Sequence, residues 1–154
     1  MSTIELGNKA PAFTLEGTGG EWSLGAAAGG PVVLYFYPRD NTPGCTQEGE
    51  SFAGLHAQFK RAKTQILGIS ADSVESHEKF KKKMGFPFEL LSDPDRRVCK
   101  LYDVIREKSM YGRKFMGIER STFLIDAKGV LREEWRKLKV NGHAAAVLAA
   151  VKTL

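Results

Sequence analysis

The two cysteines, Cys45 and Cys99, are the side chains of this sequence best suited to covalent chemistry. Cys45 follows the segment Thr42-Pro43-Gly44. Threonine is a good helix N-cap and proline is favoured at the first helical position, so this segment predicts a helix whose first turn contains Cys45. The N-terminus of a helix stabilises an anion through its unpaired N–H groups and partial positive charge. The spacing therefore predicts a reactive thiolate, with the Thr42 hydroxyl close enough to contact the same small ligand.

The alternative role for each cysteine is a buried core thiol, which is the commoner role of an unpaired cysteine. Cys45 falls in the cap-proline-glycine turn and not on the apolar stripe of its helix, which favours chemistry. Cys99 lies between Val98 and Leu101 on a short amphipathic segment, which favours packing. Two distant cysteines without a nearby histidine pair match neither a disulfide scaffold nor a zinc site, and the sequence implies no metal or organic cofactor.

Strand and helix signals alternate along the chain. The apolar run Val32–Tyr37 predicts a central strand buried on both faces, and a helix is predicted over residues 43–62. Further strands are predicted at 13–16, 22–24, 65–70, 88–91, 122–125 and 130–135, further helices at 73–84, just after 93–95 and at 142–152, and a loop or hairpin at 108–117. This order predicts an α/β fold with a mixed central sheet flanked by helices, the arrangement of a thioredoxin-like three-layer sandwich.

Composition limits the classes of function. The chain has 154 residues, of which 42% are hydrophobic and 27% charged, with a formal net charge of +5, and this fits one globular domain over residues 1–154. No apolar run could span a membrane and the first residues lack a signal-peptide pattern, so we expect a cytoplasmic protein without membrane contact. The basic stretch Lys79–Lys83 fits the solvated face of a helix, and no nucleic-acid motif accompanies it. His56, His77 and His143 have no partner at metal-ligand spacing, and we expect them at the surface.

Beyond these general patterns, Pro38-x-x-x-Thr42-x-x-Cys45 resembles the active-site signature of the peroxiredoxins. The longer stretch Thr42-Pro43-Gly44-Cys45-Thr46-x-Glu48 is similar to the PrxQ branch of that family, also called the bacterioferritin comigratory proteins. Later segments resemble the family in the same order, at 67–72, 91–93 and 115–126. The resemblance covers nearly the whole chain and implies a thioredoxin-like peroxiredoxin domain with thiol-dependent peroxidase activity.

The resemblance also implies three catalytic residues. Cys45 would be the peroxidatic cysteine, whose thiolate attacks a hydroperoxide. Thr42 would hold its hydroxyl against the thiolate and the bound peroxide. Arg120 would lie beside Cys45 and stabilise negative charge on the thiolate and on the breaking O–O bond, a task that suits a permanently charged fork of donors.

Three further residues would bind the substrate according to the same resemblance. Pro38 would shield the pocket from water. The backbone N–H group of Gly44, together with that of Cys45, would donate hydrogen bonds to the peroxide oxygens. Glu48 matches a family position that orients the active-site arginine.

The chain departs from many PrxQ relatives because it lacks a cysteine at their resolving positions. Glu50 stands five residues after Cys45, and the predicted helix at 73–84 contains no cysteine. A disulfide needs Cα atoms within about 7 Å, so pairing with Cys99 would require substantial unfolding. A one-cysteine mechanism is therefore predicted, in which glutathione, a thioredoxin-like or a glutaredoxin-like protein reduces the sulfenic acid. The resemblance to the PrxQ branch also implies a monomer. An atypical two-cysteine peroxidase with Cys99 as the resolving residue stays open.

Other classes of function are less well supported by the residues. A thioredoxin-type disulfide carrier needs a Cys-x-x-Cys pair, and the residue three after Cys45 is Glu48. A basic nucleic-acid-binding module would show salt-dependent affinity. A redox-sensing interaction protein would bind a partner after oxidation without turnover, and it is the non-enzymatic alternative to the peroxidase.

Overall fold

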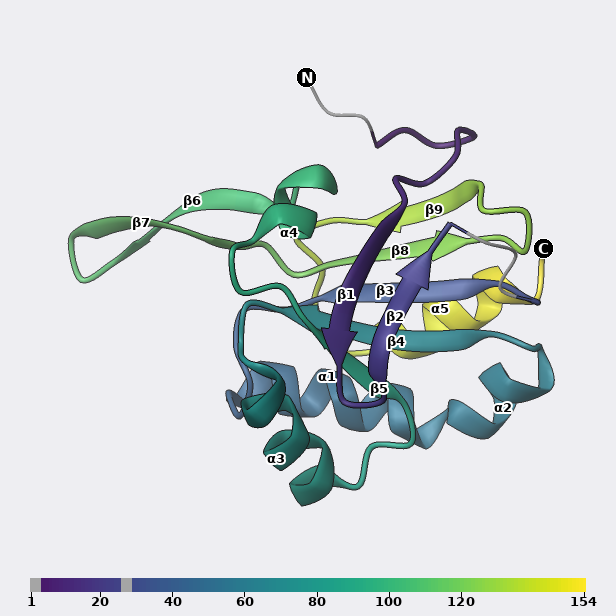
Figure 1. Ribbon diagram of the computed structural model, residues 1–154, viewed down its shortest axis with the longest axis horizontal. Helices are drawn as coiled ribbons and strands as arrows, with labels where there is room; N and C mark the ends of the chain where they lie inside the picture. Colours follow the sequence, from purple (N-terminus) through teal and green to yellow (C-terminus); the bar gives the residue numbers. More distant parts are fainter. Residues whose placement is uncertain (1–3, 26–28) are drawn as a thin grey trace.

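The computed structural model describes residues 4–25 and 29–154, which build a mixed β-sheet covered on both faces (Figure 1). Seven strands follow the order β2-β1-β5-β4-β3-β8-β9. They are β1 (Phe13–Gly17), β2 (Gly20–Leu24), β3 (Val32–Phe36), β4 (Gln65–Ser70), β5 (Glu89–Ser92), β8 (Ser121–Ile125) and β9 (Leu131–Trp135). β4 pairs in parallel with β3 and β5, whereas β8 pairs antiparallel with β3 and β9. The predicted α/β class with a mixed sheet is confirmed.

The helices complete the three layers. One face of the sheet is covered by α1 (Pro43–Gly54), α2 (His56–Arg61), α3 (Val74–Met84) and α5 (His143–Val151). The other face is covered by α4 (Arg97–Leu101) and by the β1–β2 hairpin, which pairs with β5 only at Glu16 and Gly17 and folds over this face (Figure 1). Within the residues described, none of these helices is long and apolar enough to cross a membrane.

Alternate side chains of β3 enter two separate cores. Leu34 and Phe36 point into the core beneath α4, whereas Tyr35 points into the core beneath α1. Because both faces are buried, the strand needs no polar alternation, which explains its continuous apolar sequence. The Tyr35 ring stacks on Phe52 of α1 with 4.9 Å between ring centroids. This contact holds α1 against the sheet beside the end of β3.

The single helix predicted over residues 43–62 is divided in two. α1 ends at Gly54, Leu55 adopts a non-helical backbone (φ −105°, ψ 4°), and α2 begins at His56. Glycine has a low helix propensity, so Gly54 lowers the stability of a continuous helix at this point. Phe52 and Phe59 of the predicted apolar stripe are nevertheless fully buried.

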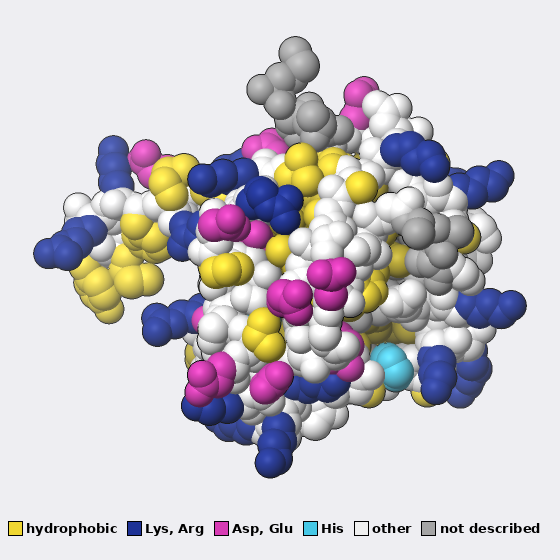
Figure 2. Space-filling model, viewed as in Figure 1, with side chains coloured by type: hydrophobic (Ala, Val, Ile, Leu, Met, Phe, Trp, Pro, Cys, Tyr) yellow, Lys and Arg dark blue, Asp and Glu magenta, His cyan; other side chains and the backbone are white. Residues whose placement is uncertain are grey.

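The segment predicted as a loop or hairpin is a two-stranded sheet of β6 (Ile105–Met110) and β7 (Arg113–Ile118). It projects from the body of the protein, and both apolar and basic side chains gather on it (Figures 1 and 2). The two turn residues between the strands, Tyr111 and Gly112, both have positive φ, as a tight hairpin requires. β7 leads the chain directly to Arg120.

The expectation of surface histidines is wrong for two of the three. His77 on α3 is fully buried, and His143 at the start of α5 is nearly so. Each ring has polar partners that offset the cost of burial. The His143 Nε2 atom lies 2.8 Å from the Thr122 hydroxyl, and the His77 Nδ1 atom lies 2.8 Å from the Asp40 carboxylate.

Close packing of α1 against Phe86 depends on Gly49. A Cβ atom at Gly49 would lie 2.3 Å from the Phe86 ring, far inside van der Waals contact. Gly54 lies on the same helix, and a Cβ atom there would meet no atom within 4 Å. These two glycines therefore separate the effect of crowding from that of helix propensity.

Gly49→Ala should destabilise the protein by about 2 kcal/mol because the added methyl group overpacks the contact with Phe86. The control Gly54→Ala should leave stability unchanged or raise it by about 0.5 kcal/mol, since alanine favours the helix. Urea denaturation followed by tryptophan fluorescence measures both. Equal stabilities of the two variants would show that the ring moves aside without cost.

Candidate active site

The residues from Tyr37 to Thr42 form the active-site loop, which joins β3 to α1. Thr42 is the N-cap residue of α1 with extended backbone angles (φ −84°, ψ 152°), and Pro43 takes the first helical position. Cys45 therefore lies in the first turn, and it is only 2% exposed. No acidic residue occupies that turn, so the positive end of the helix acts on the Cys45 sulfur without competition.

Arg120 reaches Cys45 from the short segment between β7 and β8. Its Nη2 atom lies 3.4 Å from the Cys45 sulfur, and its Nη1 atom lies 2.6 Å from Glu48 Oε1. The guanidinium passes over Gly44, where a Cβ atom would approach Nη2 to 3.0 Å. Cys45 and Glu48 are one helical turn apart, so a single cation bridges two groups on the same face of α1.

Glu48 is the buried acid of the site, with 1% of its surface exposed. Burial raises the pKa of Glu48 to about 7, even though the Arg120 guanidinium lowers it. Its second oxygen, Oε2, has no hydrogen-bond partner among the residues described. One guanidinium thus contacts both the Glu48 carboxylate and the Cys45 sulfur.

The Thr42 hydroxyl points to its own loop. It donates a hydrogen bond of 2.9 Å to the Arg39 carbonyl, and in the described structure it makes none to Cys45. Because the hydroxyl proton is used, its oxygen remains an acceptor for a ligand that brings its own proton. Pro38 is half-buried in the same loop.

Cys99 lies on the opposite face of the sheet from Cys45. Cys45 belongs to the core beneath α1, and Cys99 is fully buried in the core beneath α4. Burial and the nearby Asp93 carboxylate raise the pKa of the Cys99 thiol well above its usual value. A protonated thiol is a poor nucleophile, and both cysteines are free. The sheet separates the two sulfurs.

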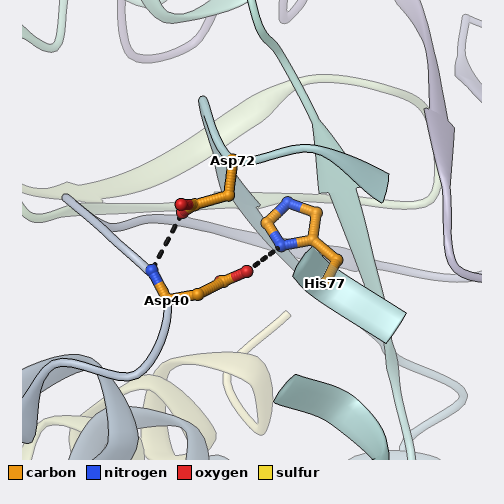
Figure 3. A group of neighbouring side chains, drawn as sticks. All are labelled: Asp40, Asp72 and His77. Carbon is orange, nitrogen blue, oxygen red and sulfur yellow. Dashed lines mark hydrogen bonds and ion pairs between the residues drawn. The ribbon is translucent and has the colours of Figure 1, made fainter. Parts of the chain in front are cut away.

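A polar cluster joins Asp40 of the active-site loop to Asp72, which follows β4, and to His77 on α3 (Figure 3). The sequence patterns did not reveal it, because Asp40 falls on an unassigned position of the motif and contacts His77 across 37 residues of sequence. Carboxylate oxygens and ring nitrogens of the cluster lie within 4.8 Å of one another, a spacing suited to a metal ion. Both oxygens of Asp40 and both ring nitrogens of His77 are already engaged in hydrogen bonds.

Comparison with known proteins places the chain among peroxide-reducing enzymes. The model of the AhpC/TSA family matches residues 6–134. The Peroxiredoxin Bcp of Xanthomonas campestris is 54% identical over 134 residues, which are 87% of this chain and 84% of that protein. The Peroxiredoxin Bcp of Bacillus subtilis is 47% identical over 153 residues, which are 99% of this chain and 98% of that protein.

Solved structures of the same group of proteins are similar to this chain. A structure of the bacterioferritin comigratory protein of Xanthomonas campestris has a TM-score of 0.88 at 48% identity, and covers 99% of this chain and 98% of its own. A mutant of PrxQ from Xylella fastidiosa has a TM-score of 0.91 at 43% identity, with 99% and 98% covered. The resemblance inferred from the motif and the thioredoxin-like fold are both confirmed, and the chain belongs to the AhpC/TSA family, as a thiol-dependent peroxidase of the PrxQ (bacterioferritin comigratory protein) branch of the peroxiredoxins.

Proposed function

We propose that this chain reduces hydrogen peroxide and organic hydroperoxides through a sulfenic acid on Cys45, with an external thiol as the reductant. The observation that carries the proposal is the 3.4 Å contact between the Cys45 sulfur and Arg120 Nη2 at the start of a helix. A thiolate at this position is stabilised by a fixed cation and by the helix dipole together. Organic hydroperoxides are included because the similar protein of Xanthomonas campestris has been studied for its alkyl peroxide reduction activity.

The first step of the proposed reaction breaks the O–O bond of the peroxide. The Cys45 thiolate attacks one peroxide oxygen, a sulfur–oxygen bond forms, and the other oxygen leaves as an alkoxide that takes up a proton to become the alcohol, or water from hydrogen peroxide. Sulfur is oxidised by two electrons and the peroxide is reduced by two. The negative charge that moves from sulfur to the leaving oxygen is the charge that the site must stabilise.

The surrounding residues suit that task. Arg120 donates to the sulfur and to the oxygen that develops charge. The first-turn N–H groups, including that of Gly44, have no partner within a helix and can donate to the peroxide. The Thr42 hydroxyl accepts the hydrogen bond of the incoming peroxide. Pro38 limits the access of water, and Glu48 holds the guanidinium in place.

The second half of the cycle requires an external thiol. That thiol attacks the sulfenic acid with loss of water to give a mixed disulfide, and a second thiol then releases Cys45 and leaves as a disulfide with the first. The observations that favour this one-cysteine route are the glutamate at position 50 and the position of Cys99 on the other face of the sheet. Glutathione, a thioredoxin-like protein and a glutaredoxin-like protein are the candidate reductants.

We extend the proposal to a single domain, residues 1–154, that acts as a monomer in the cytoplasm. Cys45, Glu48 and Arg120 all come from one chain, so their contacts need no second copy. Two free cysteines and the need for a thiol reductant fit a compartment in which thiols are kept reduced.

Intact-mass measurement after one equivalent of hydrogen peroxide tests the one-cysteine route. A sulfenic-acid trap should label Cys45 in the wild type and equally in Cys99→Ser, because Cys99 takes no part. Cys45→Ser should show no labelling. A loss of two hydrogens without trapping, abolished by Cys99→Ser, would instead establish Cys99 as the resolving residue. Oxidation of Cys45 without turnover by any thiol would favour a redox-sensing protein.

Arg120→Gln should lower the rate of Cys45 oxidation about 100-fold, because it removes the cation that faces the leaving oxygen. Arg120→Lys should lose about tenfold, since one ammonium group cannot serve Cys45 and Glu48 as the fork does. Stopped-flow single-turnover oxidation by hydrogen peroxide measures these rates. The half-exposed Arg132, paired with Asp126, provides the control Arg132→Gln, which should react as the wild type does. A rate for Arg120→Gln within threefold of the wild type would remove Arg120 from the mechanism.

Glu48 should make stability fall as pH rises. Its pKa of about 7 in the fold lies above the usual value of 4.5, so the stabilisation that it contributes is complete below pH 4.5 and is lost as pH rises through 7. The loss between pH 5 and pH 8 is roughly 2 to 3 kcal/mol. Glu48→Gln removes this titration, and its free energy of unfolding, measured by urea denaturation at both pH values, should decline less by that amount. Parallel pH profiles would contradict the raised pKa.

A further inference from the structure

His77 and Asp40 form a hydrogen-bonded pair that is closed to water. Their side chains are 0% and 2% exposed, and His77 Nδ1 lies 2.8 Å from Asp40 Oδ2. The other ring nitrogen, Nε2, lies 2.9 Å from the carbonyl oxygen of Leu91 in β5. A carbonyl oxygen can only accept, so Nε2 carries a hydrogen.

The Asp40 carboxylate decides the state of the second ring nitrogen. It accepts hydrogen bonds from the Tyr37 hydroxyl at 2.6 Å and from the Ser76 hydroxyl at 2.8 Å. Burial acts to raise the pKa of Asp40, but the hydrogen bonds from His77, Tyr37 and Ser76 outweigh it and hold that pKa below its usual value. An ionised carboxylate only accepts, so Nδ1 carries the hydrogen of its 2.8 Å contact with Asp40 Oδ2.

The His77–Asp40 pair fixes the middle of the active-site loop. Asp40 precedes Thr42 by two residues and Cys45 by five. The backbone N–H of Asp40 donates to Asp72 Oδ2 at 2.9 Å, so side chain and backbone are both held. The next residue, Asn41, has φ 63°, a left-handed conformation that asparagine adopts more readily than most other non-glycine residues, and it turns the chain toward Thr42. Asp40 is thus held from α3 through His77 and from the end of β4 through Asp72.

The two halves of the reaction make opposite demands on this loop. Attack on a small peroxide requires the first turn of α1 and Thr42 to be held in place. Reduction by a thiol larger than a peroxide requires access to Cys45, a residue that is only 2% exposed, so the loop and the first turn have to open. Any contact that stabilises the closed loop favours the first half and slows the second.

We propose that the His77–Asp40 pair is a latch on the active-site loop: it positions Thr42 and Cys45 for the peroxide, and its strength sets how readily the loop opens to the reductant. The latch rests on the proposed role of Cys45. Neither side chain touches the reacting atoms, so both are positioning residues. The pair differs from a purely structural contact because its loss changes the two half-reactions in opposite directions.

Asp40→Ala tests the latch. Oxidation of Cys45 by hydrogen peroxide in a single turnover should slow by about tenfold or more, because the loop loses its position. Reduction of the preformed sulfenic acid by 2-mercaptoethanol should accelerate by about fivefold, because the open state is more populated. In Asp40→Asn the amide can donate to a neutral His77 ring and still accept from Tyr37, so both rates should return to within about threefold of the wild type.

Leu131→Ala is the matched control, because this fully buried side chain of β9 lies in the core on the other face of the sheet. This variant should be less stable than the wild type without any change in the loop, so both rates should stay at wild-type values.

Tyr37→Phe removes one hydrogen-bond donor to Asp40 and replaces Asp40→Ala if that variant does not fold. It should slow oxidation by peroxide and accelerate reduction by the thiol, each by a smaller factor than Asp40→Ala.

Rates in the folded Asp40 or Tyr37 variant that are unchanged, or that fall together, would refute the latch while leaving Cys45 chemistry intact. Absence of any sulfenic acid in the wild type would refute the proposed function, and the latch with it.

Discussion

One guanidinium, that of Arg120, bonds to both a thiol and a carboxylate in a region nearly closed to water. Much of the fold serves this contact. α1 places Cys45 and Glu48 one turn apart, and Arg120 lies beside them just after the end of β7. Gly44 has no Cβ atom, so the guanidinium can lie close to the backbone there. Because one positive charge cannot fully compensate two buried negative charges, the proposed Cys45 thiolate and the Glu48 carboxylate would compete for this one guanidinium.

The start of α1 is held from two sides that differ in chemistry. Apolar contacts hold the body of the helix, where Phe52 stacks on Tyr35 and Gly49 lies against Phe86. Charged and hydrogen-bonded groups hold the loop before it, through Asp40. Apolar packing is insensitive to small changes of protonation, whereas the polar side depends on them. The helix can therefore stay docked while its first turn and the preceding loop change.

The sequence is most informative where the determinants are local. The buried strand β3, the N-cap Thr42 and the first-turn position of Cys45 follow from neighbouring residues and were predictable. The contact of Arg120 with Cys45 spans 75 residues and rested on family resemblance, since an arginine at a strand start is usually exposed. The buried ring of His77 had no local signal at all, because its partners Asp40 and Leu91 come from a loop and a strand that only the folded chain brings together. The break at Leu55 was missed because the apolar stripe continues across it.

The projecting hairpin of β6 and β7 has a consequence for the behaviour of the protein in concentrated solution. In the described chain it is a sheet of two strands, so each strand has an outer edge that can pair with another molecule. Its exposed apolar side chains, Met110, Tyr111, Phe115 and Met116, would strengthen such pairing. Both strands also contain basic residues, at positions 106, 108, 113 and 114. Two hairpins that approach each other bring like charges together, and salt screens that repulsion. We therefore expect added salt to promote association of this protein through its hairpin.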